Sequence, residues 1–162
     1  MKGKKTKIGD IFSVKIDEFN QKFFQYITND LTQLNSDVIR VFKCIYPLNV
    51  KINLSEVIAG DVDFYAHCVI KLGIELEYWR WIGNVGNVGD FSHVWFRDTD
   101  DFGNPDVKIS RKWWVWKINQ DEKYVGELKG IYQQAEIGVV MNPEGIVNRI
   151  ITGKYGNVYP EF

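Results

Sequence analysis

Residues 7–46 contain three stretches in which alternate side chains are apolar, and polar turns separate them. In the first stretch, Phe12, Val14 and Ile16 share one side. A period of two is typical of a β-strand, because successive side chains point to opposite faces. The pattern therefore predicts a meander whose three strands cover residues 11–16, 23–28 and 38–46.

The remainder of the chain is also rich in strand signals. Short apolar runs alternate with connections that contain Gly, Pro, Asn or Asp, the residues that favour turns. One helical turn is expected from Ser55 to Ala59, where Gly60 would stop it. Further strands are predicted at 63–70, 74–82, 91–97, 112–118 and 135–140, with loops at 71–73, 83–90 and 98–106.

The clearest helix signal begins at Asn142. Asn is a preferred N-cap residue, and Pro143 then occupies the first helical position, where a missing N–H costs little. An apolar stripe on one side follows, so a helix is expected from Pro143 to about Lys154. The side chains expected to pack it on the sheet are Ile146, Ile150 and Ile151.

These elements predict an α+β fold that is rich in strands. We expect a mainly antiparallel twisted sheet or partial barrel, with one C-terminal helix and room for one short helix. The 162 residues fit a single domain and suffice to bury roughly 70% of the unfolded surface. Residues 1–7 are expected to form a basic flexible tail, and residues 8–162 a single globular domain.

Charge is unevenly distributed along the chain. The net charge is −1, but four of the 20 basic residues lie within the first seven positions, so 16 face 21 acidic ones in the remainder. The body is therefore acidic, which disfavours binding to nucleic acid. No apolar run reaches the ~20 residues that a membrane span needs, and no signal peptide is evident. Cys44 and Cys68 are expected to be unbonded thiols, so a cytoplasmic location is predicted.

All six tryptophans lie between Trp79 and Trp116. They could form part of the core, a stacking platform for a sugar or a base, or anchors for a protein partner. Alternation predicts that Trp114 and Trp116 face the core and that Trp113 lies on the opposite face of its strand. Trp95 is likewise interleaved with polar neighbours.

The acidic segment 98–106 is predicted to be an exposed loop, because it contains Gly103 and Pro105. It does not fit a calcium loop, since Phe102 and Ile109 stand where an EF-hand needs oxygen ligands. Exposed carboxylates in such a loop can contact a basic partner. The candidate partner-binding residues are Asp98, Asp100, Asp101, Asp106, Trp95 and Trp113.

The sequence offers no evident catalytic, metal or cofactor site. His67 and His93 lack the spacing of a zinc ligand set. The glycines of the 83–90 segment precede a predicted strand instead of a phosphate-binding helix. A nucleophilic Cys–His pair stays open, because such partners need only meet in space. We expect no cofactor.

Several segments resemble one known family. They read IGDIFSVKI (8–16), VDFYAHCVIKLGIELEYW (62–79), FRDTDD (96–101), SRKWWVWKI (110–118), AEIGVV (135–140) and ITGKYGNVYP (151–160). These segments, which cover most of the chain, resemble the sequences of the immunity proteins of bacterial polymorphic-toxin systems, specifically immunity protein family 26. The resemblance implies a protein that binds and neutralises a cognate toxin. It does not assign a functional role to any individual residue of this chain.

The function expected from this resemblance is toxin neutralisation by binding, without enzymatic activity. An acidic body suits a basic toxin such as a nuclease. The family is also labelled together with a phosphotriesterase-type hydrolase, which normally needs several His and Asp metal ligands. The alternatives are therefore an uncharacterised hydrolase and a sugar- or peptide-binding module.

Overall fold

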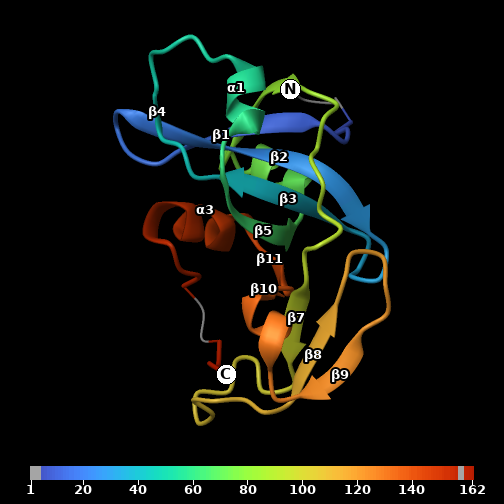
Figure 1. Ribbon diagram of the computed structural model, residues 1–162. Helices are drawn as coiled ribbons and strands as arrows, with labels where there is room; N and C mark the ends of the chain where they lie inside the picture. Colours follow the sequence, from blue (N-terminus) through green and yellow to red (C-terminus); the bar gives the residue numbers. More distant parts are fainter. Residues whose placement is uncertain (1–4, 157–158) are drawn as a thin grey trace.

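The computed structural model describes residues 5–156 and 159–162, and these residues form two β-sheets (Figure 1). The large sheet has seven strands in the order β11-β5-β3-β2-β1-β6, with β4 paired to β2. Its strands are β1 (Asp10–Lys15), β2 (Asn20–Asp30), β3 (Ser36–Phe42), β4 (Tyr46–Pro47), β5 (Val62–Cys68), β6 (Arg80–Asn84) and β11 (Val140–Met141).

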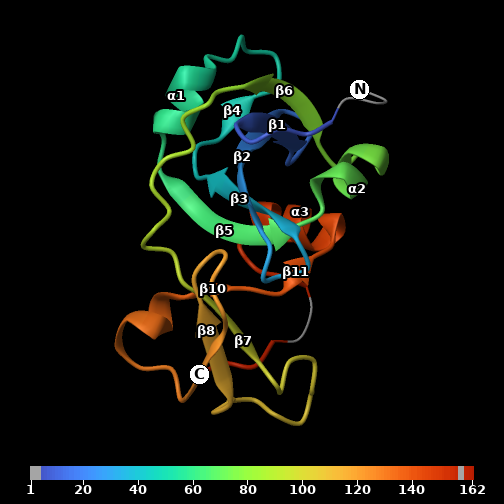
Figure 2. The ribbon, with the colours of Figure 1, turned by 90° about the vertical axis from the view of Figure 1, so that its right-hand side faces the viewer.

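The small sheet has four strands in the order β10-β7-β8-β9 and lies below the large sheet in both ribbon views (Figures 1 and 2). Its strands are β7 (Phe96–Thr99), β8 (Trp113–Trp116), β9 (Lys123–Gly126) and β10 (Glu136–Ile137). The helices are α1 (Leu54–Ala59), α2 (Ile70–Glu75), α3 (Pro143–Thr152) and a 3-10 turn, η1 (Gly130–Gln134).

Most neighbouring strands run antiparallel, and both sheets stay open over the described residues. Two short pairs are parallel, β11 with β5 and β10 with β7. Because β10 and β11 are close in the chain, the segment that contains them joins the edges of the two sheets. The predicted α+β class with a mainly antiparallel sheet is confirmed.

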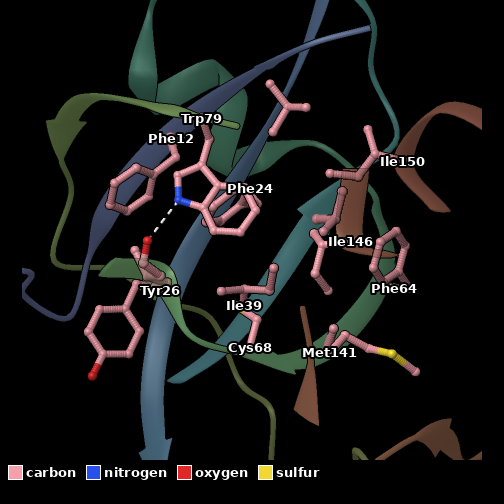
Figure 3. Close-up of a cluster of buried hydrophobic side chains, with 14 residues drawn as sticks. Phe12, Phe24, Tyr26, Ile39, Phe64, Cys68, Trp79, Met141, Ile146 and Ile150 are labelled. Carbon is pink, nitrogen blue, oxygen red and sulfur yellow. Dashed lines mark hydrogen bonds between the residues drawn. The ribbon is translucent and has the colours of Figure 1, made fainter. Parts of the chain in front are cut away.

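One face of the large sheet is covered by α2 and α3. The even-numbered apolar side chains of β1, β2 and β5 and the odd-numbered ones of β3 point toward this face, as a period of two requires. Figure 3 shows them meeting Trp79 and the inner side of α3. The buried residues labelled there are Phe12, Phe24, Tyr26, Ile39, Phe64, Cys68, Trp79, Met141, Ile146 and Ile150.

The opposite face has two covers. Helix α1 covers one end through Val57, which packs with Phe23 and Phe42. The small sheet covers the other end, where Phe96 and Trp116 pack on the large sheet. This face of the sheet is therefore buried by unrelated elements at its two ends.

Between these two elements, the loop from Val85 to Asp90 crosses the sheet. The buried Arg40 guanidinium donates from Nε to Gln25 Oε1 over 2.9 Å and from Nη2 to the Asn87 carbonyl over 3.2 Å. Gln25 in turn donates to the Val85 carbonyl over 2.8 Å. The predicted loop at 83–90 is confirmed from Val85 on, whereas Gly83 and Asn84 belong to β6, and two buried polar side chains hold the loop in place.

Helix α3 follows its sequence signals closely. The Asn142 side chain accepts a hydrogen bond from the Gly145 N–H over 2.7 Å, and Gly153 ends the helix with a left-handed φ of 83°. Ile146 and Ile150 are buried as predicted. The prediction for Ile151 is wrong, because this side chain is 52% exposed on the outer side of the helix.

The strand predicted at 74–82 is wrong over its first half. Residues 70–75 form α2, whose first N–H donates to Asp37 Oδ2 over 2.9 Å. Trp79 then lies directly on Gly73, where an added Cβ would be 1.9 Å from the indole. This close packing favours a tight helical turn over an extended chain, and only residues 80–84 continue as β6.

Other boundaries also differ from the expected ones. The strand expected to reach Tyr46 ends at Phe42, and β7 starts only at Phe96. Strand β9 was not predicted at all, because Lys123 and Tyr124 carry no alternating apolar pattern. Alternation cannot detect a short edge strand of this kind, which has few buried side chains.

Cys44 and Cys68 are both free thiols, as predicted. Cys68 is buried in β5, whereas Cys44 is exposed just beyond the end of β3. Of the predicted basic tail, residues 1–4 lie outside the described residues. Lys7 is tied to the body, since its N–H donates to Asp10 Oδ2 over 2.8 Å. None of the described helices is long and apolar enough to span a membrane.

Candidate functional site

The small sheet packs on the large one through a buried aromatic contact. The Phe96 and His67 rings meet edge to face with centroids 4.3 Å apart, and Trp116 lies 6.2 Å from the same imidazole. In the ladder of the small sheet, Phe96 pairs with Trp116. This pair thus defines which face of the small sheet meets the large sheet.

The same face continues past the large sheet and becomes exposed. Asp98 pairs with Trp114, and Trp114 pairs with Tyr124 of β9, so all three side chains point to this side. The Trp114 and Tyr124 rings meet edge to face with centroids 5.1 Å apart. Tyr124 is 53% exposed and Trp114 is partly buried. The sheet therefore presents an aromatic pair to solvent.

Carboxylates surround this pair. Trp114 Nε1 donates to Asp100 Oδ1 over 3.2 Å, which fixes the indole. Burial raises the pKa of Asp98, and the nearby charges of Glu122 and Asp100 raise it further. The negative charges of Glu122 and Asp100 therefore both act on the Asp98 carboxyl. We call the set Asp98, Asp100, Trp114, Glu122 and Tyr124 the Trp114 face.

The other two predicted aspartates differ from each other in their surroundings. Asp101 accepts from the Ser110 hydroxyl over 2.8 Å and from Lys112 Nζ over 3.3 Å, and its side chain is only 12% exposed. Its charge is thus already paired within the protein. Asp106 is exposed in the turn-rich part of the loop. The loop is confirmed from Asp100 on, whereas the first two residues of the predicted segment, Asp98 and Thr99, belong to β7.

The prediction that Trp113 is a surface anchor is wrong. Trp113 is 0% exposed, and its indole N–H donates to the Ser110 carbonyl over 2.9 Å. Tyr159 and Phe162 pack against it, and the Arg97 guanidinium lies 5.2 Å from its ring centroid. A side chain enclosed in this way cannot reach a partner unless the protein opens.

Trp95 is partly buried on the same side of the small sheet as Trp113. Its ring meets Tyr132 edge to face at 5.1 Å, and Lys117 Nζ lies 5.0 Å from its centroid. This side is opposite to Trp114. The structure therefore does not bring Trp95 together with Asp98 and Asp100 on one surface.

The alternating pattern of β8 correctly placed Trp113 and Trp114 on opposite faces of the sheet. It assigned Trp114 to the core, although Trp113 is the buried residue. Which face is covered depends on distant segments, since Leu128 and Tyr159 cover the Trp113 side. No local signal in β8 reveals this. Tyr124 and Glu122 were missed because β9 itself was missed.

No group of three or more His, Cys, Asp or Glu side chains that could hold a metal ion occurs within residues 5–156 and 159–162. His67 Nε2 pairs with Asp30 Oδ2 over 2.9 Å, and both side chains are fully buried. His93 is exposed beside Tyr65, with ring centroids 6.5 Å apart. Neither histidine lies beside a cysteine thiol in a contact that the structure describes.

Comparisons with known proteins give no relative. No family model matches the chain, and neither a curated protein nor a solved structure matches it.

Proposed function

We propose that this protein binds a basic protein toxin through the Trp114 face and neutralises it by covering its functional surface. The observation that carries the proposal is the exposed Trp114–Tyr124 pair surrounded by Asp98, Asp100 and Glu122. Resemblance to immunity protein family 26 supplies the class of partner. The aromatic and acidic side chains of the Trp114 face would make the contacts with such a partner.

Aromatic side chains are effective anchors in protein interfaces. Trp and Tyr bury a large area with few rotatable bonds, and they are enriched among residues that dominate binding energy. Trp114 is already fixed by its bond to Asp100 and by the Tyr124 ring. Binding would therefore cost little side-chain entropy.

The carboxylates give the face its preference for a basic partner. Exposed charges act mainly on the rate of encounter, and they reject surfaces of like charge. A nuclease needs a positive surface to hold the phosphate backbone. An acidic face can occupy that surface in place of the nucleic acid, so a nuclease is the proposed toxin class.

The proposed location is the cytoplasm. The thiol of Cys44 is exposed and unpaired, and the buried thiol of Cys68 is unpaired as well. Free thiols persist in a reducing compartment. A nuclease toxin would act on nucleic acid in the same compartment, so an immunity protein would meet it there.

The first step of the test is to look for a toxin gene next to the gene for this chain and to use its product as the binding partner. Co-expression should restore growth, and the purified proteins should form a complex. Trp114→Ala and Tyr124→Ala should each speed dissociation at least tenfold, whereas Asp100→Lys should mainly slow association, with a smaller salt dependence.

Matched controls are available at the far turn between β1 and β2. Phe19 is exposed and Glu18 lies beside it, so Phe19→Ala and Glu18→Lys change the same side-chain types away from the Trp114 face. These variants should bind like the unmodified protein. The absence of a complex, or equal rates for face and control variants, would overturn the proposal.

A further inference from the structure

Strand β9 forms the outer edge of the small sheet (Figure 1). It pairs with β8 on one side, and no strand lies on its other side among residues 5–156 and 159–162. Lys123 and Tyr124 of this strand are both exposed. An edge of this kind presents main-chain N–H and C=O groups with which a strand of another protein can pair. We call this side of β9 the open edge.

The hydrogen bonds of the neighbouring strands show which main-chain groups point to the open edge. The Gly138 N–H donates to the Arg97 carbonyl over 2.8 Å, so the main chain of Arg97 points to β10 and away from β8. Val115 lies opposite Arg97, so its main chain points to β9, where it pairs with Lys123. Main-chain groups alternate in direction along a strand, and those of Tyr124 therefore point to the open edge.

Tyr124 also has its side chain on the Trp114 face. The ladder places it opposite Trp114, and the two rings meet with centroids 5.1 Å apart. A strand added at the open edge would continue the small sheet, and its side chains on this face would lie beside the Tyr124 ring. One segment of a partner could thus contact both the main chain and the aromatic side chain of the same residue.

A β-bulge limits the length of this edge. The register between β8 and β9 shifts after Tyr124, so Val125 is an extra residue with none opposite it in β8. Gly126 follows with a left-handed φ of 68°. A bulge bends the strand and interrupts regular pairing. An added strand is therefore expected to pair on the N-terminal side of the bulge, from Tyr124 toward Glu122.

Charge determines which kind of strand fits. Asp121 and Glu122 precede β9, and Lys123 is the one basic residue beside them. Asp98 and Asp100 add two more carboxyl groups on the Trp114 face. Pairing between the open edges of two copies would bring these acidic groups together, which is unfavourable. A basic segment would instead place opposite charges next to them.

We propose that a basic segment of the partner protein adds to β9 as an extra strand and pairs with Glu122 and Tyr124. This inference rests on the function proposed above, because it takes the Trp114 face as the partner-binding surface. It adds the means by which the partner is held. In strand addition, main-chain hydrogen bonds supply affinity and alternate side chains supply specificity. Basic side chains at alternate positions would point to the carboxylates of the Trp114 face.

The test uses the full chain labelled with 15N and a short peptide of alternating lysine and valine. Without the peptide, amide hydrogen exchange should be faster at Tyr124 than at Lys123, because the ladder pairs only the Lys123 N–H. The peptide should give saturable NMR shifts at the Tyr124 amide and the Trp114 indole. It should also slow exchange of the Tyr124 amide at least tenfold.

Two control peptides separate main-chain pairing from attraction by charge. A peptide with the same side chains and methylated peptide nitrogens cannot donate main-chain hydrogen bonds, so it should bind at least tenfold more weakly. A peptide with glutamate in place of lysine should not bind. Equal binding of either control, or no shift at Tyr124 with the lysine peptide, would overturn the inference. So would a dimer of the protein that Tyr124→Pro dissociates, because it would assign the open edge to a second copy.

The toxin, once identified, distinguishes this inference from the proposed function. Tyr124→Ala removes the ring and keeps the N–H, whereas Tyr124→Pro removes both, and an edge strand tolerates Pro where the N–H faces solvent. Tyr124→Pro should bind the toxin at least tenfold more weakly than Tyr124→Ala. Equal binding of these two variants would overturn strand addition and leave the Trp114 face as the proposed surface. Toxin binding that Trp114→Ala leaves unchanged would count against the proposed function instead.

Discussion

His67 Nε2 lies 2.9 Å from Asp30 Oδ2, and both side chains are fully buried between the large and small sheets. Asp30 also accepts from the Thr32 hydroxyl over 2.7 Å and from the Asn119 N–H over 3.0 Å. Asn119 belongs to the turn between β8 and β9. One carboxylate thus joins the end of β2, strand β5 of the large sheet and the turn that follows β8 in the small sheet.

This carboxylate should make stability depend on pH. Burial alone would raise the pKa of Asp30, but bonds from His67, Thr32 and the Asn119 N–H hold it at about 2. A depressed pKa contributes stability that is complete above the unfolded value near 3.8 and is lost as the pH falls through about 2. Asp30→Asn should therefore cost roughly 2 kcal/mol at pH 7 and much less below pH 3.

Urea unfolding across this pH range measures the effect. Asp106→Asn, at an exposed position, is the control and should differ little from the unmodified protein at any pH. A penalty for Asp30→Asn that stays constant from pH 7 to pH 2.5 would contradict the linkage.

Gly138 should be intolerant of any side chain. A Cβ there would lie 2.2 Å from the buried Trp116 indole and 3.1 Å from Phe96 Cβ. Neither ring can move without disturbing the contact between the sheets, so Gly138→Ala should lower the free energy of unfolding by on the order of 2 kcal/mol. Gly86→Ala, which has open space around it, should stay within about 0.5 kcal/mol. Similar unfolding midpoints for the two variants would refute this.

Trp113 and Trp114 should give opposite results despite being neighbours. Trp113→Ala removes a fully buried indole and should cost about 3–5 kcal/mol of stability. Trp114→Ala removes a partly exposed one, so it should cost far less stability and act mainly on partner binding. Thermal unfolding of the two variants decides the point, and a larger loss for Trp114→Ala would reverse the assignment of the two faces.

The cap of α3 should be measurable on its own. Asn142→Ala removes the acceptor for the Gly145 N–H and should cost about 1 kcal/mol. Asn142→Asp keeps an acceptor and adds a negative charge at the helix start, so it should be neutral or stabilising. Denaturant midpoints would show this order, and equal midpoints for the two variants would argue against the cap.

The two thiols should differ in reactivity. Burial, followed by the charge of Asp37, raises the pKa of Cys68 well above its ordinary value. The thiolate is the reactive form, so Cys68 should resist labelling until the protein unfolds. Exposed Cys44 should react at once with a disulfide reagent such as dithionitrobenzoate. One fast thiol that disappears in Cys44→Ser is expected, and two fast thiols would contradict the burial of Cys68.

Local patterns predicted those parts of the fold whose signals are local. The meander of β1 to β3 follows from alternation, and α3 follows from Asn142, Pro143 and Gly153. Helix α2 was missed, because its residues were assigned to the end of a strand at 63–70, to a connection at 71–73 and to the start of a strand at 74–82. Its actual shape depends on the fit between Gly73 and Trp79, which only the folded chain brings together.

The candidate site was predictable only in part. Asp98 and Asp100 were predicted to form a partner-binding surface together with Trp95 and Trp113. In the structure, the tryptophan that pairs with Asp98 is Trp114. The choice between Trp113 and Trp114 depends on Tyr159 and Phe162, which reach Trp113 from the far end of the sequence. Residue types along a strand give the sides of a sheet, but they do not show what covers each side.

The short strands β10 and β11 have a consequence for how the chain folds. Val140 pairs with His67 and Glu136 pairs with Phe96, so both contacts join positions far apart in sequence. Closing such long loops costs entropy before any hydrogen bond is gained, which slows folding. The two meanders can form early, from neighbouring residues. The two sheets can dock only after the segment that contains β10 and β11 has paired with both of them. Before that step, the aromatic surfaces of both sheets are exposed and can associate with other chains.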